Sequence, residues 1–184
     1  REGLVALDGQ WALDWQRLDL PSDSTADSRA SPWIQVPGPW NGAVLGASAL
    51  GRHGYGTYRL TVNCQDASGL ALSLPMQHSA ARVYVNGVLM AQQGVPGASA
   101  ATTQPSPVQQ VVELSKSTCP LRIAAQVANF DHRRGGMIRS MELGTQQQLH
   151  ERRELQLARD LFALGSMAIM SLLSLLFYAS RRRE

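Results

Sequence analysis

Hydrophobic and polar residues alternate with a period of two along most of residues 1–145, which is typical of half-buried β-strands. Turn residues such as Asp8-Gly9 and Asn86-Gly87 separate the alternating runs. Asn-Gly between two apolar runs predicts a two-residue β-hairpin, because both residues accept a positive φ. The pattern predicts strands at Trp11–Trp15, Tyr58–Val62, Leu70–Leu74, Ala81–Val85, Val88–Met90, Val111–Leu114, Leu121–Val127 and Ile138–Leu143.

Segments of small and polar residues interrupt these strands. Pro21–Pro32 is rich in Ser and Asp, and Gly94–Pro107 is rich in Ala, Thr, Ser and Pro, so both are expected to be loops outside the core. Gly54-Tyr55-Gly56 is expected to be a turn before the second strand. Seven or eight short strands at this spacing predict an all-β sandwich over residues 1–145.

The pattern changes at Gln146. Residues Gln146–Asp160 are good helix formers with a broad apolar face, and Leu161–Ser180 contains no formal charge. Twenty helical residues rise about 30 Å, which matches the hydrocarbon thickness of a bilayer. We therefore expect a juxtamembrane helix at 146–160 and a transmembrane helix at 161–180. No Gly or Pro lies between them, so they could form one stiff rod from the domain to the bilayer that transmits motion. The alternative is that 146–160 is only a solvated juxtamembrane helix.

Small residues recur every three positions along the apolar segment, at Gly165, Ala168, Ser171 and Ser174. Such a stripe is typical of close packing between membrane helices, although chance placement also produces one. We expect the segment to be the first span of a bundle, packed against other transmembrane helices of the same protein, with the protein continuing past Glu184.

Flanking charges give the expected orientation. Arg181, Arg182 and Arg183 predict that residues 181–184 form a cytoplasmic basic flank, whereas Arg152, Arg153 and Arg159 on the other side nearly balance them. The tight arginine cluster at 181–183 and the extracellular character of the β-domain favour residues 1–160 on the outer side of the membrane.

Composition narrows the partners. Seventeen Lys and Arg against fourteen Asp and Glu give a formal net charge of +3, and many of the arginines flank the apolar segment. This distribution favours a bilayer surface and argues against nucleic acid. The two cysteines, Cys64 and Cys119, lie near the ends of predicted strands, where a disulfide and two buried free thiols both fit.

Four blocks in a fixed order resemble a known family: Asp8–Trp11, Trp33–Asn41, Gly54–Leu60 and Val83–Gly87. They are similar to the sugar-binding domain of family 2 glycoside hydrolases, a galactose-binding-like jelly-roll β-sandwich. The closer resemblance, which includes Asn129–Gly136, is to the periplasmic sensor domain of bacterial seven-transmembrane receptors with diverse intracellular signalling modules. It implies a bacterial inner-membrane location and an intracellular output such as a diguanylate cyclase or histidine kinase.

No catalytic pattern stands out. Glycoside hydrolysis generally requires two carboxylates about 5–10 Å apart, whereas the acids of this domain lie mostly in loops, and Glu113 and Glu142 have no motif around them. A nucleophile elbow, a metal-spaced His/Cys set and a phosphate-binding Gly loop are all missing from the sequence. We expect the chain to be non-catalytic and to need no metal or cofactor.

Candidate ligand-binding residues fall into two groups. Amide, imidazole and guanidinium groups suit sugar hydroxyls or a carboxylate, and aromatic faces suit stacking on a pyranose. The alternative is a structural role for Asn129–Arg134 at the junction of sandwich and helix, with Trp40 filling the core. The candidates are Asn129, His132, Arg133, Arg134, Trp40, Tyr55 and Tyr58.

Two functional hypotheses follow. In the first, the domain senses a small molecule, such as a carbohydrate, or a periplasmic protein, and relays the signal through the membrane. In the second, a tethered carbohydrate-binding module holds polysaccharide without signalling. The oligomeric state, monomer or homodimer, stays open.

Overall fold

The computed structural model describes residues 3–19 and 31–181, so the loop predicted at Pro21–Pro32 lies outside the described residues except for Ser31 and Pro32. The chain divides into two compact units, Arg1–Gln146 and Gln147–Glu184.

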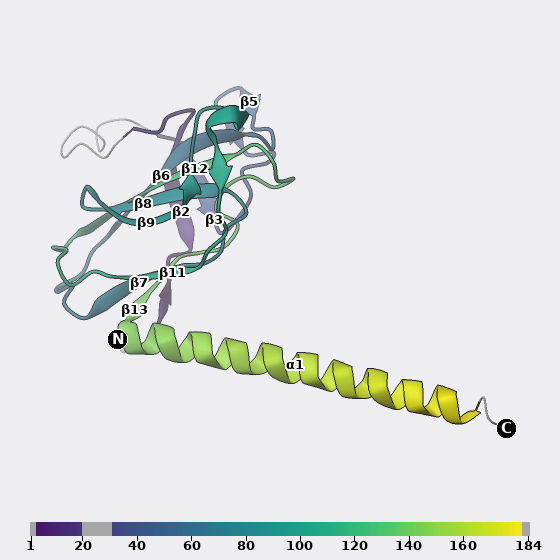
Figure 1. Ribbon diagram of the computed structural model, residues 1–184. Coiled ribbons are helices and arrows are strands. Elements are labelled where there is room, and N and C mark those ends of the chain that lie inside the picture. The colour runs from purple at the N-terminus through teal and green to yellow at the C-terminus, as the bar shows by residue number, and fades with distance from the viewer. Residues whose placement is uncertain (1–2, 20–30, 182–184) are drawn as a thin grey trace. The chain divides into compact units, whose positions relative to one another are not determined.

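The first unit consists of two main antiparallel sheets, which Figure 1 shows as separate layers. The larger sheet has the strand order β10 (Gln104–Pro105), β9 (Val88–Val95), β8 (Ala80–Val85), β12 (Leu121–Asn129), β6 (Gly54–Val62), β2 (Gly9–Trp15), β3 (Trp33–Val36). The smaller sheet has the order β1 (Val5–Ala6), β13 (Glu142–Thr145), β7 (Leu70–Leu74), β11 (Gln110–Glu113). A small hairpin pairs β4 (Val44–Leu45) with β5 (Ser48–Ala49).

Both sheets contribute to one hydrophobic core. Trp11 and Leu13 of β2 are fully buried, as are Leu72 of β7 and Val83 of β8. Because successive side chains of a strand point to opposite faces, the alternating pattern directs one face of each sheet into this core. Each large apolar side chain buried there contributes roughly 1.5–3 kcal/mol. The domain is therefore a β-sandwich, as the alternation predicts.

The register of β12 defines two ends of the sandwich. This strand pairs with β6 from Leu121↔Val62 to Asn129↔Gly54, and with β8 up to Ala128↔Ala80. The end of β12 and the starts of β6 and β8 therefore lie together, and we call this the loop end.

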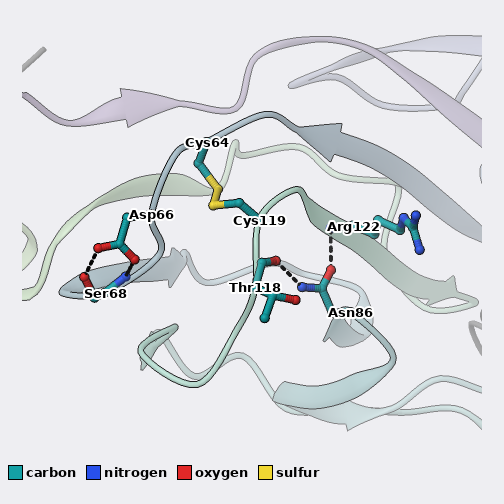
Figure 2. Close-up of a disulfide and its surroundings, with 7 residues drawn as sticks. All are labelled: Cys64, Asp66, Ser68, Asn86, Thr118, Cys119 and Arg122. Carbon is teal, nitrogen blue, oxygen red and sulfur yellow. Dashed lines mark hydrogen bonds between the residues drawn. A yellow bond between two sulfur atoms is a disulfide. The ribbon is translucent and has the colours of Figure 1, made fainter.

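The opposite end carries a disulfide between Cys64 and Cys119, whose Cα atoms lie 5.5 Å apart (Figure 2). Of the two alternatives that the sequence allows, a disulfide or two free thiols, the structure has the disulfide. We call this the disulfide end.

The turn of the β8–β9 hairpin also belongs to the disulfide end. Asn86 donates from Nδ2 to the carbonyl oxygen of Thr118 (2.6 Å) and accepts at Oδ1 from the backbone N–H of Arg122 (2.8 Å), as Figure 2 shows. Asn86 and Gly87 have φ of 49° and 84°, which confirms the predicted Asn-Gly turn.

The last predicted strand, Ile138–Leu143, is wrong in its bounds, because β13 covers Glu142–Thr145. Backbone carbonyls before β13 accept hydrogen bonds from residues outside the strands and not from a neighbouring strand. Gly38 N donates to Met137 O (2.9 Å), and Leu7 N donates to Met141 O (2.8 Å). Their backbone groups are satisfied by loop contacts and need no continuous ladder.

Two further expectations about loops are also wrong. Gly54-Tyr55-Gly56 is the beginning of β6 and not a turn. The Trp15 ring packs so closely on Gly54 that a Cβ there would lie 2.4 Å from Trp15 Cη2, and only glycine permits this approach. The segment 94–107 contains the end of β9, a short 3-10 helix at Ala100–Thr102 and β10. Thr103 is buried, and its hydroxyl donates to Ser99 O (2.8 Å).

The second unit is a single helix, α1 (Gln146–Arg181), which covers both the predicted juxtamembrane and transmembrane segments. It is the one helix in the described ranges long and apolar enough to cross a membrane. Leu161, Phe162 and Phe177 expose 68%, 78% and 76% of their surface. Ser166 and Ser174 donate their hydroxyls to the carbonyl oxygens of Phe162 and Met170 (2.8 Å each), so neither brings an unsatisfied hydroxyl into an apolar environment.

Candidate ligand-binding site

Three segments meet around the end of β12 at the loop end of the sandwich. The carbonyl oxygen of Arg52 accepts from Trp40 Nε1 (3.1 Å) and from Asn129 Nδ2 (2.9 Å), which joins the loops before β4 and β6 to the segment after β12. The segment 129–136 is therefore held by contacts from distant parts of the chain.

Asn129 fixes the turn with its side chain. The residue is buried, its Nδ2 also donates to His132 O (2.8 Å), and its Oδ1 accepts from His132 N (3.1 Å). The amide is fully engaged inside the protein. Asn129 thus positions the loop.

Asn41 holds the other side of the same segment. Its Nδ2 donates to Arg133 O (3.0 Å), and its Oδ1 accepts from Gly135 N (3.0 Å). The backbone N–H of Trp40 donates to Gly135 O (2.9 Å). The sequence analysis missed Asn41 as a loop-fixing residue, since it lies 94 residues before Gly135 and only the fold brings them together.

Gly135 and Gly136 are needed where the segment passes over Trp40. A Cβ at Gly135 would lie 2.2 Å from Trp40 Nε1 and 2.5 Å from Arg52 O. Gly136 has a φ of +103°, which side chains rarely adopt. The backbone of this pair therefore packs closely against Trp40.

Trp40 and Tyr58 lie beneath this segment and are completely buried. The Trp40 ring packs edge-on against Trp15 (centroids 4.9 Å apart) and stacks with Tyr58 (6.5 Å). Both side chains fill the core, so they offer no exposed face for a pyranose. The core position was an open alternative for Trp40, whereas Tyr58 was expected only as a stacking face.

Burial also affects the Tyr58 phenol. Loss of hydration raises the pKa of Tyr58, and the nearby backbone N–H of Met137 offsets a small part of this rise. That N–H does not form a bond of ordinary geometry, because Tyr58 Oη has no hydrogen-bond partner among the described residues. The phenol therefore stays neutral and acts as a core group.

Tyr55 lies three residues before Tyr58 on β6, so its side chain projects from the other face of the strand. It is half-buried, and the sheet separates it from the aromatic cluster of Trp40 and Tyr58. These three aromatic residues therefore do not form one platform.

His132, Arg133 and Arg134 remain at the surface. His132 is half-buried, and its Nδ1 lies 3.2 Å from Arg134 N and 3.1 Å from Arg134 O, which fixes the ring to the backbone. Both arginine side chains are exposed. In the described ranges, neither guanidinium has a carboxylate within ion-pair distance.

Two histidines from other loops approach this segment. The ring of His78, which lies between β7 and β8, stacks on His132 with centroids 4.4 Å apart. His53 lies 6.5 Å from Phe130 between ring centroids. Their positions in the sequence gave no signal, because the contacts depend on which strands are neighbours.

The arrangement suits ligand binding by the surface side chains of His132, Arg133 and Arg134 on a backbone held by hydrogen bonds. Asp131 is the one acid of segment 129–136, so the segment itself offers no carboxylate pair for glycoside hydrolysis. The described residues contain no group of three or more His, Cys, Asp or Glu side chains placed to hold a metal.

The sequence matches no known protein family and no curated protein. Solved structures of β-glucuronidase from Ruminococcus gnavus are similar in fold. The complex with D-glucuronic acid has a TM-score of 0.53 and 14% identity, covering 77% of this chain and 29% of the enzyme. The ligand-free structure has a TM-score of 0.53 and 15% identity, covering 77% and 28%.

These similarities define a class of fold. At such identities the likeness concerns the fold alone, and it is consistent with the galactose-binding-like β-domain expected from the sequence blocks. The chain spans less than a third of the length of these enzymes.

Proposed function

We propose that this chain is the extracytoplasmic ligand-sensing domain of a bacterial membrane signalling receptor, with its first membrane span. The sandwich, of galactose-binding-like jelly-roll type, recognises a carbohydrate or another small ligand. Helix α1 relays binding to further transmembrane helices and to an intracellular module such as a diguanylate cyclase or histidine kinase.

The observation that carries this proposal is the direct passage from β13 to α1. Strand β13 ends at Thr145, and α1 begins at Gln146 and continues without interruption to Arg181. A helix that follows a sheet strand without a flexible linker favours transmission of movement, whereas a Gly/Ser-rich linker would absorb it.

Contacts inside the sandwich connect the loop end to the residues just before this strand. Arg139 donates its backbone N–H to Gln77 Oε1 (3.3 Å), and Gln77 Nε2 donates to Arg139 O (2.6 Å). Gln77 directly precedes His78, which stacks on His132. At the other end of the strand, Thr145 pairs with Leu70. A ligand that shifts the 129–136 segment would therefore act on the residues that lead into β13.

The disulfide supports the outer location. Disulfides persist in oxidising compartments such as the bacterial periplasm and are rare in the cytosol. Cys64 and Cys119 are bonded, and the apolar part of α1 exposes its large side chains along its length. We place residues 1–160 in the periplasm, residues 161–180 in the inner membrane and residues 181–184 in the cytoplasm.

We also propose that this chain performs no catalysis. The fold likeness covers less than a third of the glucuronidase chains, and the exposed side chains at the loop end are mainly cationic and imidazole groups. Any enzymatic activity would belong to a separate output domain of the full-length protein.

A membrane-tethered carbohydrate-binding module without signalling is the second candidate. It is favoured by the fold likeness to domains of a carbohydrate-active enzyme. The apolar helix α1 would serve as its tether. The two candidates differ in whether movement of the sandwich must reach the helix.

The test is an insertion of Gly-Ser-Gly-Ser after Thr145 in the full-length protein, with output measured as cyclic dinucleotide synthesis or autophosphorylation. A matched control carries the same insertion after Ala47, in the exposed turn between β4 and β5. A receptor should lose or change its output only with the first insertion while membrane localisation is kept. Unchanged output with both insertions would favour the tether.

A further inference from the structure

We propose that the loop end is an anion-binding site, where His78, His132, Arg133 and Arg134 bind a carboxylate or phosphate group of the ligand. The proposal rests on the proposed ligand-sensing function and specifies the chemistry of what is sensed. It adds His78 and its neighbours to the candidate site.

Positive and ionisable groups from three loops gather at this end. Arg52 and His53 precede β6, His78 precedes β8, and Arg133 and Arg134 follow β12. The backbone contact between Arg52 and Asn129 and the stacking of His78 on His132 bring these loops together. Against these groups the three loop segments supply one acid, Asp131.

The guanidinium groups of this cluster have no acidic partner in the described ranges. The ion pairs found there are Arg17–Asp19 (3.2 Å) and Arg59–Asp14 (2.7 Å), and neither includes a residue of the cluster. Neighbouring like charges repel one another, and an anion relieves that repulsion. The planar guanidinium also donates two parallel hydrogen bonds to a carboxylate or phosphate.

Internal contacts hold the backbone beneath the cluster in place. Asn129 and Asn41 fix the segment from both sides, and Gly135 packs against Trp40. Binding therefore orders only the exposed side chains, which lowers its entropic cost.

The experiment uses residues 1–184 in detergent micelles and follows the imidazole C–H signals of each histidine by NMR. D-Glucuronate and D-glucose form a matched pair of probes that differ at C6 in a carboxylate against a hydroxymethyl group, and inorganic phosphate is the third probe. His150, exposed on α1, is an internal control whose signals should not move. We expect saturable shifts of the His78 and His132 signals with glucuronate or phosphate, and none with glucose.

Variants separate this site from general attraction to positive charge. Arg133→Gln with Arg134→Gln should weaken anion binding about tenfold or more, the effect of losing one charged hydrogen bond. Arg122→Gln, on an exposed arginine at the opposite end of β12, should leave binding unchanged.

Each outcome decides a point. Saturation by glucuronate and not by phosphate indicates an acidic sugar or other carboxylate, and the reverse indicates a phosphate. Equal effects of glucose and glucuronate, absence of shifts with both anions, or equal losses in the two sets of variants would overturn the anion site. Binding of neutral sugars alone would overturn the anion site but leave the sensing function intact. Anion binding without a response to the Thr145 insertion would support the anion site but contradict the sensing function.

Discussion

Replacing Gly135 with alanine tests the packing that shapes the candidate site. The added Cβ would lie 2.2 Å from Trp40 Nε1, 2.4 Å from Trp40 Cε2 and 2.5 Å from Arg52 O. Ordinary contacts of this kind are about 3.5–4.0 Å, so the indole or the segment must move by more than 1 Å. Trp40 is completely buried between Trp15 and Tyr58 and has little room to move.

The size of the effect follows from two losses. Forcing an extra carbon into a packed core costs about 1–3 kcal/mol. Moving the indole also breaks the bond from Trp40 Nε1 to Arg52 O (3.1 Å), which contributes about 1 kcal/mol. Together they predict a decrease of about 2–4 kcal/mol in the free energy of unfolding. Gly51→Ala is the matched control, because a Cβ at Gly51 would meet nothing within 4 Å.

The assay is urea unfolding of residues 1–184 in detergent micelles, followed by tryptophan fluorescence. All four tryptophans, Trp11, Trp15, Trp33 and Trp40, lie in the sandwich, so the signal reports this unit and not the helix. A difference below about 0.5 kcal/mol between Gly135→Ala and Gly51→Ala would refute the packing argument, since surface substitutions commonly vary by that amount.

Two further predictions concern buried groups of the sandwich. Tyr58→Phe removes a buried hydroxyl that has no hydrogen-bond partner among the described residues, so the unfolding free energy at pH 7 should stay constant or rise by up to about 1 kcal/mol. Because burial raises the pKa of Tyr58, the unfolded chain loses this proton first above about pH 10, and wild-type stability falls there more than that of the variant; a destabilised variant at pH 7 would contradict this. Replacing Cys64 and Cys119 together with alanine should lower stability by about 4 kcal/mol, given a sequence separation of 55 residues, and reduction of the wild type should match it. Equal unfolding midpoints with and without a reducing agent would show that the disulfide does not stabilise the domain.

Local patterns predicted those parts of the fold that depend on near neighbours in sequence. The Asn86-Gly87 hairpin and the helix beginning at Gln146 appear where the sequence places them. The short edge strands β3 and β10 escaped prediction, because two to four residues carry little periodicity. Gly54 and Gly56 indicated a turn, but they belong to a strand whose neighbours approach too closely for side chains.

The candidate site was predictable only in part for the same reason. The run His132-Arg133-Arg134 is visible in the sequence, and its side chains do reach the surface. The roles of Asn41 and His78 arise from strand neighbours that no local pattern specifies. Trp40 suited either a sugar platform or the core, Tyr58 was expected in the platform, and burial assigns both to the core.

The most direct test of the account is whether the sandwich lies outside the cytoplasm on a membrane-spanning α1. Ala47→Cys introduces a thiol at an exposed turn, and the described residues contain no other free cysteine. The account predicts that a membrane-impermeant maleimide labels this thiol in intact spheroplasts expressing the full-length protein, and that the labelled protein stays in the membrane after an alkaline carbonate wash. Labelling only after the membrane is permeabilised, or release of the protein by the wash, would contradict it.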